Sequence, residues 1–364
     1  MSDVIKKIIV IVSSLLGLAL FTVFLLIGGF FYFNSPPDFS RDSLKNRENF
    51  VIDSGGGADS VGGVNFEVHK GESATSAGDR LAELGLIRSR LFWQLLCRYD
   101  EGQIKAGNYR IDIPSNTVAI HRLLVSGRQM LLRVTIPEGL TVSKTARLME
   151  NAGICASDEF IAAASDPEIT GFYRIPGPGM EGYLYPDTYL FPSGYPAEMV
   201  VRAMADNFFA RIEKMDGNIP PMTPDELNKR VILASIVERE YRLDEEAPLM
   251  AGVFTNRLDI GMALQSCATV EYVITEIQRR PHPEVLSTRD TEIRDPYNTY
   301  IRPGLPPGPI ASPGEVALKA AFNPAKSDYL YFRLVEPDSG KHYFSRTLDD
   351  HIKAGRLYTK RSSP

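Results

Sequence analysis

The 364-residue sequence predicts an α+β protein with a single N-terminal transmembrane helix, a small α+β module and a larger mixed α/β domain around a central buried helix. Three observations support this prediction. An uncharged apolar run opens the chain, strand and helix patterns alternate over residues 64–155, and a strongly apolar helix pattern follows residue 223. The expected boundaries are 1–34 for the cytoplasmic tip and anchor, 35–63 for a linker, 64–155 for the module and 156–364 for the larger domain.

The apolar run covers residues 8–33 and contains no charged side chain. About 26 residues at 1.5 Å each reach about 39 Å, which exceeds the hydrocarbon core of about 30 Å. A cleaved signal peptide is the alternative, but its apolar core would be about 7 to 15 residues with an Ala-x-Ala-like end. Because Lys6 and Lys7 precede the run, the positive-inside rule leaves the N-terminus in the cytoplasm. We therefore expect a single-pass inner-membrane anchor with the C-terminal domains in the periplasm.

The segment after the anchor is rich in serine, proline and glycine, which predicts a flexible tether over residues 35–63. The module beyond it contains three related units, each with a strand pattern, a turn and a helix pattern that stops at glycine. They end at Gly85, Gly127 and Gly153. Repeated small strand and helix units indicate an α+β module.

Composition excludes several classes of function. A net charge of −5 provides no basic surface for nucleic acid, so no nucleic-acid partner is expected. The five histidines show no metal-ligand spacing, and Gly-x-Ser-x-Gly and phosphate-loop motifs are missing, so we expect neither metal nor cofactor. Of the three cysteines, at least one should be unpaired and buried, without a disulfide framework. A nucleophilic pair of Cys267 and His282 is a less favoured alternative.

The most informative stretch is the apolar helix pattern that ends in two glutamates. Thr223, Pro224 and Glu226 form a capping-box pattern, and residues 231–237 are mostly apolar. Glu238 falls on the apolar stripe of this helix, where lost hydration raises the pKa of a carboxyl group and lets it act as a general acid. A structural hydrogen bond at a helix end is the alternative. Glu240 lies about 200° further round, so the two glutamates are expected to face opposite ways and not to form a pair.

Aromatic side chains crowd a loop region rich in proline and glycine that begins near residue 171. Aromatic rings with polar tips suit the faces and hydroxyl edges of sugars, although most such rings simply pack in loops. The residues concerned are Tyr173, Tyr183, Tyr185, Tyr189 and Phe191. Near the C-terminus, strand patterns flank a Pro337 to Gly340 turn, which predicts a β-hairpin before a final helix.

Several ungapped blocks closely resemble the endolytic murein transglycosylase family MltG, also called YceG-like. The blocks are residues 181–189, 234–240, 253–258, 264–272, 297–300 and 304–314. The resemblance implies a membrane-anchored enzyme that cuts peptidoglycan strands between N-acetylmuramic acid and N-acetylglucosamine. It also implies that 64–155 is LysM-like and that 156–364 is catalytic. LysM-like modules generally bind glycan, and a spacer with the same fold is the alternative. An enzyme that terminates nascent strands would have peptidoglycan synthases as candidate partners.

The resemblance also implies roles for individual residues. The catalytic glutamate of the family is the first in the Ala-Ser-Ile-Val-Glu block, which is Glu238 in this sequence. Candidate substrate-binding residues are Gln265, Asn298, Tyr300, Tyr185 and Glu240. For Asn298 and Tyr300 the alternative is that they only shape the turn before Gly304. Where the family usually has Asp-Pro, this chain has Cys267 and Ala268.

Two other functions stay open at this stage. One is a hydrolytic muramidase, which needs a second carboxylate at a set distance; Glu181, Asp187 and Glu271 are its candidates. The other is a non-catalytic, membrane-tethered glycan-binding scaffold. The resemblance implies a different, favoured mechanism, in which Glu238 acts as acid towards the glycosidic oxygen and then as base towards the muramic acid 6-hydroxyl, which closes a 1,6-anhydro ring.

Overall fold

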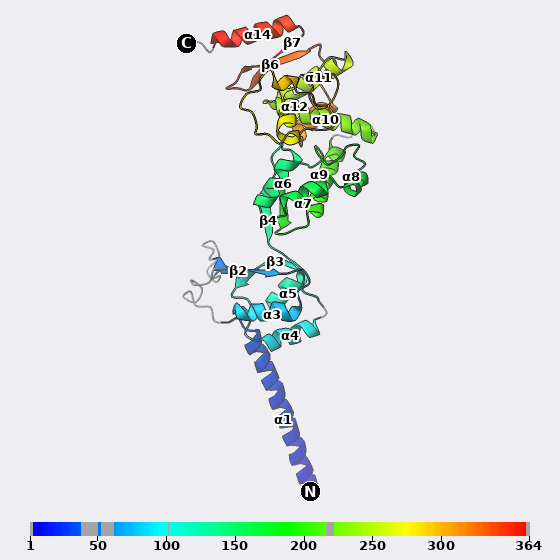
Figure 1. The fold of residues 1–364 in the computed structure, drawn as a ribbon. Coiled ribbons are helices and arrows are strands. Elements are labelled where there is room, and N and C mark those ends of the chain that lie inside the picture. The colour runs from blue at the N-terminus through cyan, green and yellow to red at the C-terminus, as the bar shows by residue number, and fades with distance from the viewer. Residues whose placement is uncertain (1–2, 38–49, 52–61, 101, 216–221, 362–364) are drawn as a thin grey trace. The chain divides into compact units, whose positions relative to one another are not determined.

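The computed structural model describes residues 3–37, 50–51, 62–100, 102–215 and 222–361 of the chain. The chain divides into two compact units, Met1–Leu131 and Leu132–Pro364 (Figure 1). This division lies before the boundary at residue 155 that the sequence suggests. The division falls earlier because residues 131–155 contact later parts of the chain. β4 (Leu131–Thr135) pairs with β5 (Thr188–Pro192), and α6 (Val142–Asn151) packs on α7 (Ser157–Ala164).

The first unit begins with α1 (Asp3–Asn34), a helix of 32 residues whose apolar side chains lie mostly exposed. Its segment Lys7–Asn34 is long and apolar enough to cross a membrane. The expected tether is only partly described. Within it, β1 (Phe50–Val51) forms a strand, whereas residues 38–49 and 52–61 lie outside the described residues.

The module of the first unit is a three-stranded antiparallel sheet with three helices. The sheet order is β1-β2-β3, where β2 is Gly62–Val68 and β3 is Gly107–Ile113. The helices are α3 (Ala74–Glu83), α4 (Arg90–Tyr99) and α5 (Thr117–Ser126). Alternate β2 residues Val64, Phe66 and Val68 are buried, as expected for a sheet with one covered face. Trp93 fills the core and packs so tightly on Gly78 that a Cβ atom there would overlap it.

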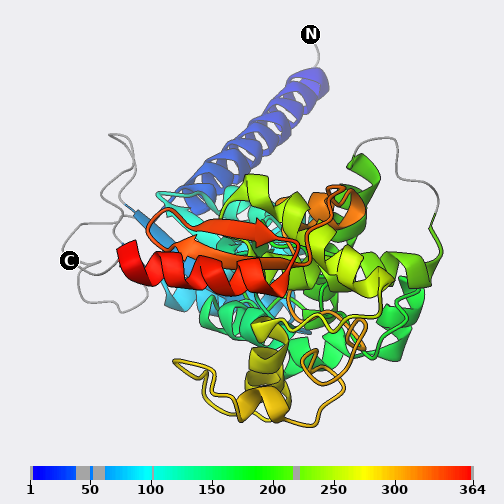
Figure 2. The ribbon, with the colours of Figure 1, turned by 90° about the horizontal axis from the view of Figure 1, so that it is seen from above.

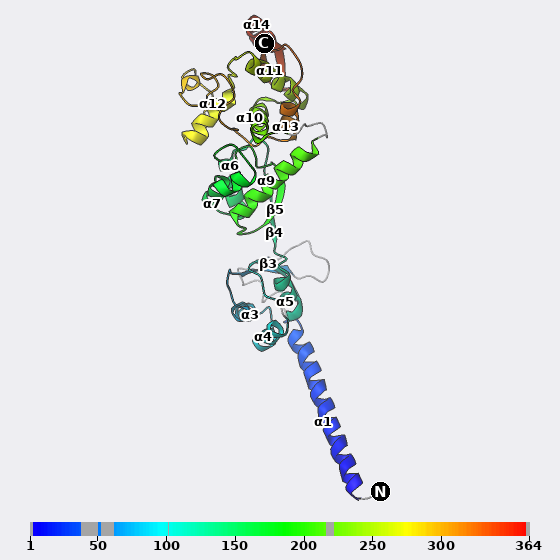
Figure 3. The ribbon, with the colours of Figure 1, turned by 90° about the vertical axis from the view of Figure 1, so that its right-hand side faces the viewer.

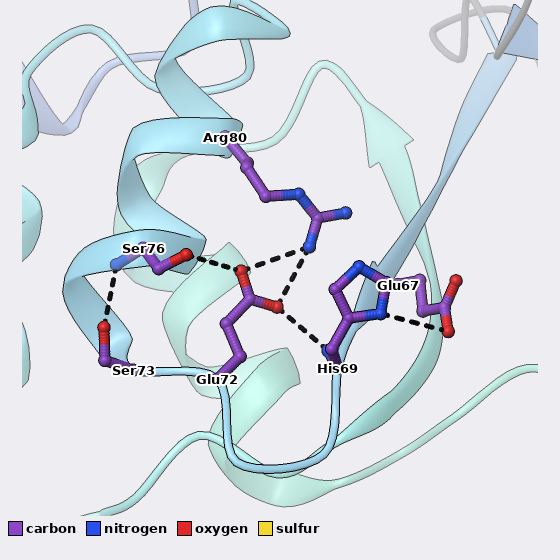
Figure 4. A network of polar contacts seen from close by, with 6 residues as sticks. All are labelled: Glu67, His69, Glu72, Ser73, Ser76 and Arg80. Carbon is purple, nitrogen blue, oxygen red and sulfur yellow. Dashed lines mark hydrogen bonds and ion pairs between the residues drawn. The ribbon is translucent and has the colours of Figure 1, made fainter.

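A polar network holds the turn between β2 and α3 (Figure 4). The Glu72 carboxylate accepts hydrogen bonds from Arg80, from the Ser76 hydroxyl and from the His69 backbone N–H. Ser73 caps α3 by accepting from the Ser76 N–H at 3.1 Å. The Ser73 cap satisfies a donor that a helix start leaves unpaired. The first strand-and-helix unit of the sequence thus forms here as predicted.

The second unit starts with the β4–β5 ribbon and four helices around it. After α6 and α7 come α8 (Pro167–Phe172) and α9 (Ala197–Lys214), and α7 packs against α9. The aromatic residues of this region mainly build the core: Tyr173 stacks on Phe209, and Tyr183 meets Phe208 edge to face. These aromatic residues thus serve mainly in internal packing.

The rest of the second unit surrounds α10 (Pro224–Glu240). This helix packs on α11 (Ala247–Asp259) and on α13 (Glu315–Phe322), which Figure 3 shows beside it. A short helix, α12 (Cys267–Tyr272), follows a loop from α11 and continues as a π-helical turn, Val273–Ile277. Two 3-10 turns, Asp244–Glu246 and Asp290–Glu292, complete the connections.

The chain ends as the sequence predicts, with a hairpin and a helix. β6 (Tyr331–Glu336) pairs antiparallel with β7 (Lys341–Ser345). Helix α14 (Leu348–Arg361) lies along this hairpin, as Figure 2 shows. The hairpin is anchored to the unit through Glu246, whose carboxylate accepts from the His342 backbone N–H at 3.0 Å and contacts the His342 ring at 2.7 Å.

Candidate active site

Helix α10 is fixed at its start by the capping box that the sequence predicts. The Thr223 hydroxyl accepts from the Glu226 N–H, and the Glu226 carboxylate accepts from the Thr223 N–H at 2.8 Å. All residues of 231–237 are buried, and the helix ends at Glu240 with Tyr241 in an extended conformation. The last turn, with Glu238 and Glu240, therefore emerges from the core at a fixed place.

A cleft of about 710 Å³ opens at this end of α10. Its walls come from segments far apart in the sequence: the β4–α6 loop, the α11–α12 loop, the β6–β7 hairpin and α14. Residues that line it include Glu138, Gly139, Glu238, Arg239, Glu240, Arg242, Arg257, Gln265, Ser266, Cys267, Tyr300, Arg333, His342 and His351. Carboxylate and guanidinium groups thus line the same cleft.

Glu238 is partly buried at the edge of this cleft. Its Oε2 accepts a hydrogen bond of 2.9 Å from the N–H of Gly314, the residue that precedes α13. The pKa of Glu238 is raised to about 7: burial is the largest cause and the charge of Glu138 adds to it, whereas the Gly314 N–H and the Arg239 charge oppose the rise. Near pH 7 the group is therefore close to half protonated, and it can both give and take a proton.

Glu138 is a residue of the site that sequence reasoning missed. Its carboxylate lies against the Cα of Gly314, where a Cβ atom would overlap it, so Gly314 brings Glu138 and Glu238 together. The neighbouring Gly139 has φ of +75° and its backbone passes close to the Glu238 side chain. The sequence 136–139 reads only as the end of a strand and a glycine turn. No local signal indicates that the turn returns to α10.

Glu240 lines the same cleft as Glu238, although the two side chains are expected to leave the helix in opposite directions. Its Oε1 accepts from the Ser266 hydroxyl, and burial raises the pKa of Glu240. The helical angle between the two residues is as predicted, but α10 stops at Glu240. Loops can therefore wrap around the helix end and enclose both sides of the last turn.

Gln265, Cys267 and Tyr300 form another wall of the cleft. Gln265 is exposed and has φ of +52°, which is unfavourable for a residue other than glycine. The Cys267 Sγ lies 3.0 Å from the Tyr300 hydroxyl. All three cysteines are free: Cys155 is buried, as expected of at least one of them, whereas Cys97 is half-buried and Cys267 is exposed.

Two candidate residues do not reach the cleft. Asn298 is fully buried, donates to the carbonyls of Thr291 and Ile293, and accepts from the Tyr300 N–H. Asn298 therefore shapes the turn before Gly304, which was the alternative to a role in substrate binding. Tyr185 is 5 % exposed and packs under the Arg211 guanidinium, whose carbon lies 5.1 Å from the ring centre.

The other acids considered for a second carboxylate have different partners. Glu181 accepts from the Val142 N–H at the start of α6, and burial raises the pKa of Glu181 to about 8. Asp187 pairs with Arg211 at 3.0 Å, and Glu271 pairs with Arg239 at 3.2 Å. None of the three lines the Glu238 cleft. In the described part of the chain, no three His, Cys, Asp or Glu side chains gather as metal ligands.

Comparison with known proteins gives consistent results. The model of the YceG-like family matches residues 66–356. The endolytic murein transglycosylase of Bacillus subtilis is 28% identical over 317 residues, which cover 82% of this chain and 86% of that protein. The enzyme of the same name from Streptococcus pneumoniae is 27% identical; the match covers 79% of this chain but only 57% of that longer protein.

Among solved structures, a crystal structure of a putative YceG-like protein from Listeria monocytogenes is similar, with 31% identity and a TM-score of 0.52. The match covers 80% of this chain and 98% of that one. The family model includes the module, α10 and the cleft residues of the second unit. This chain therefore belongs to the YceG-like family.

Proposed function

We propose that this chain is an endolytic lytic transglycosylase that cuts peptidoglycan strands between N-acetylmuramic acid and N-acetylglucosamine and leaves 1,6-anhydro ends. The observation that carries the proposal is Glu238: a partly buried carboxyl group at the edge of a large cleft, with a pKa of about 7. A pKa close to the working pH suits a group that must act first as acid and then as base. Membership of a family whose matched relatives are named transglycosylases supports the reaction class.

In the proposed first step, protonated Glu238 gives its proton to the glycosidic oxygen. The bond from that oxygen to C1 of the muramic acid breaks, and the glucosamine end leaves as an alcohol. Positive charge develops at C1 and the ring oxygen, as in other glycoside cleavages. Glu238 is now a carboxylate, and the Gly314 N–H stabilises this form through its 2.9 Å hydrogen bond.

In the second step, the Glu238 carboxylate takes the proton of the muramic acid 6-hydroxyl, and that oxygen bonds to C1. The ring closes without water, and Glu238 returns to its starting form. We assign Glu138 an electrostatic role: its negative charge favours protonated Glu238 before cleavage and the positively charged sugar during it. In this mechanism Gln265 and Tyr300, which line the cleft, contact the N-acetyl group, and Glu240 holds the loop of Gln265 through Ser266.

The same proposal assigns roles to the first unit. Helix α1 is the single-pass anchor in the inner membrane, with the N-terminus in the cytoplasm and both units in the periplasm, because Lys6 and Lys7 precede the apolar run. The module is LysM-like and holds glycan strands near the membrane. This position suits an enzyme that acts on nascent strands beside peptidoglycan synthases and ends their elongation.

One observation favours a second candidate, a hydrolytic muramidase. Glu138 supplies a second carboxylate in the cleft, which a hydrolase needs to activate water. The two reactions differ in their products, because a hydrolysed end carries one water more than an anhydro end.

The test is digestion of purified peptidoglycan by the full chain in detergent micelles. Mass spectrometry of the released fragments should find anhydromuramic ends, and the fragments should be long from the earliest time points because cleavage is internal. Reducing ends that have gained water would assign the chain to the muramidases. Binding to peptidoglycan without any released product would leave the glycan-binding scaffold as its function.

A further inference from the structure

Helix α4 carries an apolar stripe that no described residue of the module covers. Leu91, Leu95 and Tyr99 are spaced four residues apart, so they share one face of the helix, and they are 72%, 51% and 85% exposed. Trp93, on the opposite face, is completely buried. Within residues 62–100 and 102–131, Leu131 is the only other large apolar side chain with such exposure. Clustered exposure of this kind marks an interaction surface.

The end of α1 contacts this region of the module through side chains and backbone groups. The rings of Phe30 and Phe92 meet edge to face with centres 5.5 Å apart. The Thr117 hydroxyl donates to the Phe33 carbonyl at 3.2 Å, and the Val118 N–H donates to the Asn34 side chain at 2.9 Å. Figures 1 and 3 both show α4 and α5 at this end of α1. The stripe therefore lies beside the point where the anchor ends.

The length of the anchor sets the level of that point. The apolar segment Lys7–Asn34 has 28 residues, and at 1.5 Å per residue it reaches about 42 Å, more than the hydrocarbon core of about 30 Å. Its last turn, with Phe30 and Tyr32, therefore extends into the headgroup region. Because Phe92 contacts Phe30, the first turn of α4 lies at the same level.

The polar edge of α4 fits the same environment. Arg90 and Arg98 are exposed and lie in the row next to the stripe. Helices that lie in the membrane interface combine an apolar face with arginine or lysine on the polar side, and tyrosine prefers the headgroup level. Long arginine side chains can reach lipid headgroups while their stems cover apolar surface.

We infer that α4 lies in the headgroup region of the membrane that α1 crosses, with Leu91, Leu95 and Tyr99 inserted between phospholipids. The inference rests on the anchoring role of α1 given under the proposed function. It fixes the module on the lipid surface by two elements rather than by a single tether. The outer face of the β1-β2-β3 sheet, which carries the exposed Asn65, then points away from the lipid.

The test uses tryptophan fluorescence of the full chain in vesicles of phosphatidylethanolamine and phosphatidylglycerol. Leu95→Trp places a probe in the stripe, and Asn65→Trp is the matched control at an exposed strand position. The wild-type chain, whose one tryptophan is the buried Trp93, sets the background. Flotation of the vesicles first shows whether the chain is anchored, so failure of the anchor is separated from failure of this inference.

Lipids with bromine near the headgroup should quench the added emission of Leu95→Trp at least about twofold, as expected for an interfacial side chain. Bromine near the chain ends should quench it less, and Asn65→Trp should keep its emission in both lipids. Equal emission of Leu95→Trp with and without bromine, in chains that float with the vesicles, would overturn the inference. Protection of that probe from aqueous acrylamide without bromine quenching would also overturn it and would assign the stripe to contact with a second copy of the chain.

Discussion

Glu238→Gln should make the second unit more stable above neutral pH while removing activity. Burial raises the pKa of Glu238 from its ordinary 4.5 to about 7. Each pKa unit corresponds to about 1.4 kcal/mol, so ionising this side chain in the folded protein costs at most about 3 kcal/mol of unfolding free energy. The amide is never charged, and its oxygen can still accept the hydrogen bond from Gly314.

The sign of the pH dependence follows from the raised pKa. Below pH 4.5 the carboxyl group is protonated in both the folded and the unfolded chain, so it adds no penalty. As pH rises through 4.5 the unfolded chain loses the proton first, and stability falls until the folded group ionises at about pH 7. The advantage of the glutamine variant should therefore be about 1 kcal/mol or less at pH 5 and about 3 kcal/mol above pH 8.

Urea unfolding of the full chain in detergent micelles at both pH values measures this difference. Far-ultraviolet circular dichroism is the suitable signal, because the single tryptophan, Trp93, reports on the module only. Glu159→Gln, at an exposed position of α7, is the control and should change stability at neither pH. If Glu238→Gln raised the unfolding free energy equally at both pH values, or lowered it at high pH, the account of a partly buried carboxyl group with a raised pKa would be refuted.

Three further outcomes test the arrangement of the cleft. Glu138→Gln should lower the pKa of Glu238 and move the alkaline limb of the rate profile to lower pH, which a purely structural role of Glu138 would not do. Gln265→Gly should relieve the backbone at φ of +52° and raise unfolding free energy by about 1 kcal/mol in the same urea assay; a fall in turnover would accompany this gain if the side chain contacts substrate. Asn298→Ala should cost about 1 to 3 kcal/mol or more of stability, because it removes a fully buried amide with several partners. Unchanged stability of Asn298→Ala would contradict its role in the turn.

Local features of the sequence predicted much of the fold. The capping box at Thr223 sets the start of α10, the glycine stops of the module mark its helix ends, and the C-terminal hairpin forms around the predicted turn. Each of these depends on residues close together in the chain. Propensity, capping and turn chemistry act at that range, so a single sequence contains the information.

The sequence pattern does not predict the cleft, because the contacts that form the cleft join residues far apart in the chain. Glu138 reaches Glu238 only because the β4–α6 loop packs on the residue before α13, and Gly314 leaves the space for it. Glu240 shares the cleft because α10 stops there, which a helical wheel does not represent. The two compact units divide at residue 131, earlier than the predicted boundary at 155, because β4 pairs with a strand that lies more than fifty residues later in the chain.

The central claim is that Glu238 is the one acid and base of the reaction, and product analysis of matched variants tests it most directly. Full chains with Glu238→Gln or Glu159→Gln are incubated with purified peptidoglycan, and anhydromuramic ends are counted by mass spectrometry after circular dichroism has shown that both variants are folded. The account predicts undiminished ends for Glu159→Gln and a loss of about 10² to 10⁴ in rate for Glu238→Gln. Anhydromuramic ends formed at the native rate by folded Glu238→Gln would contradict it.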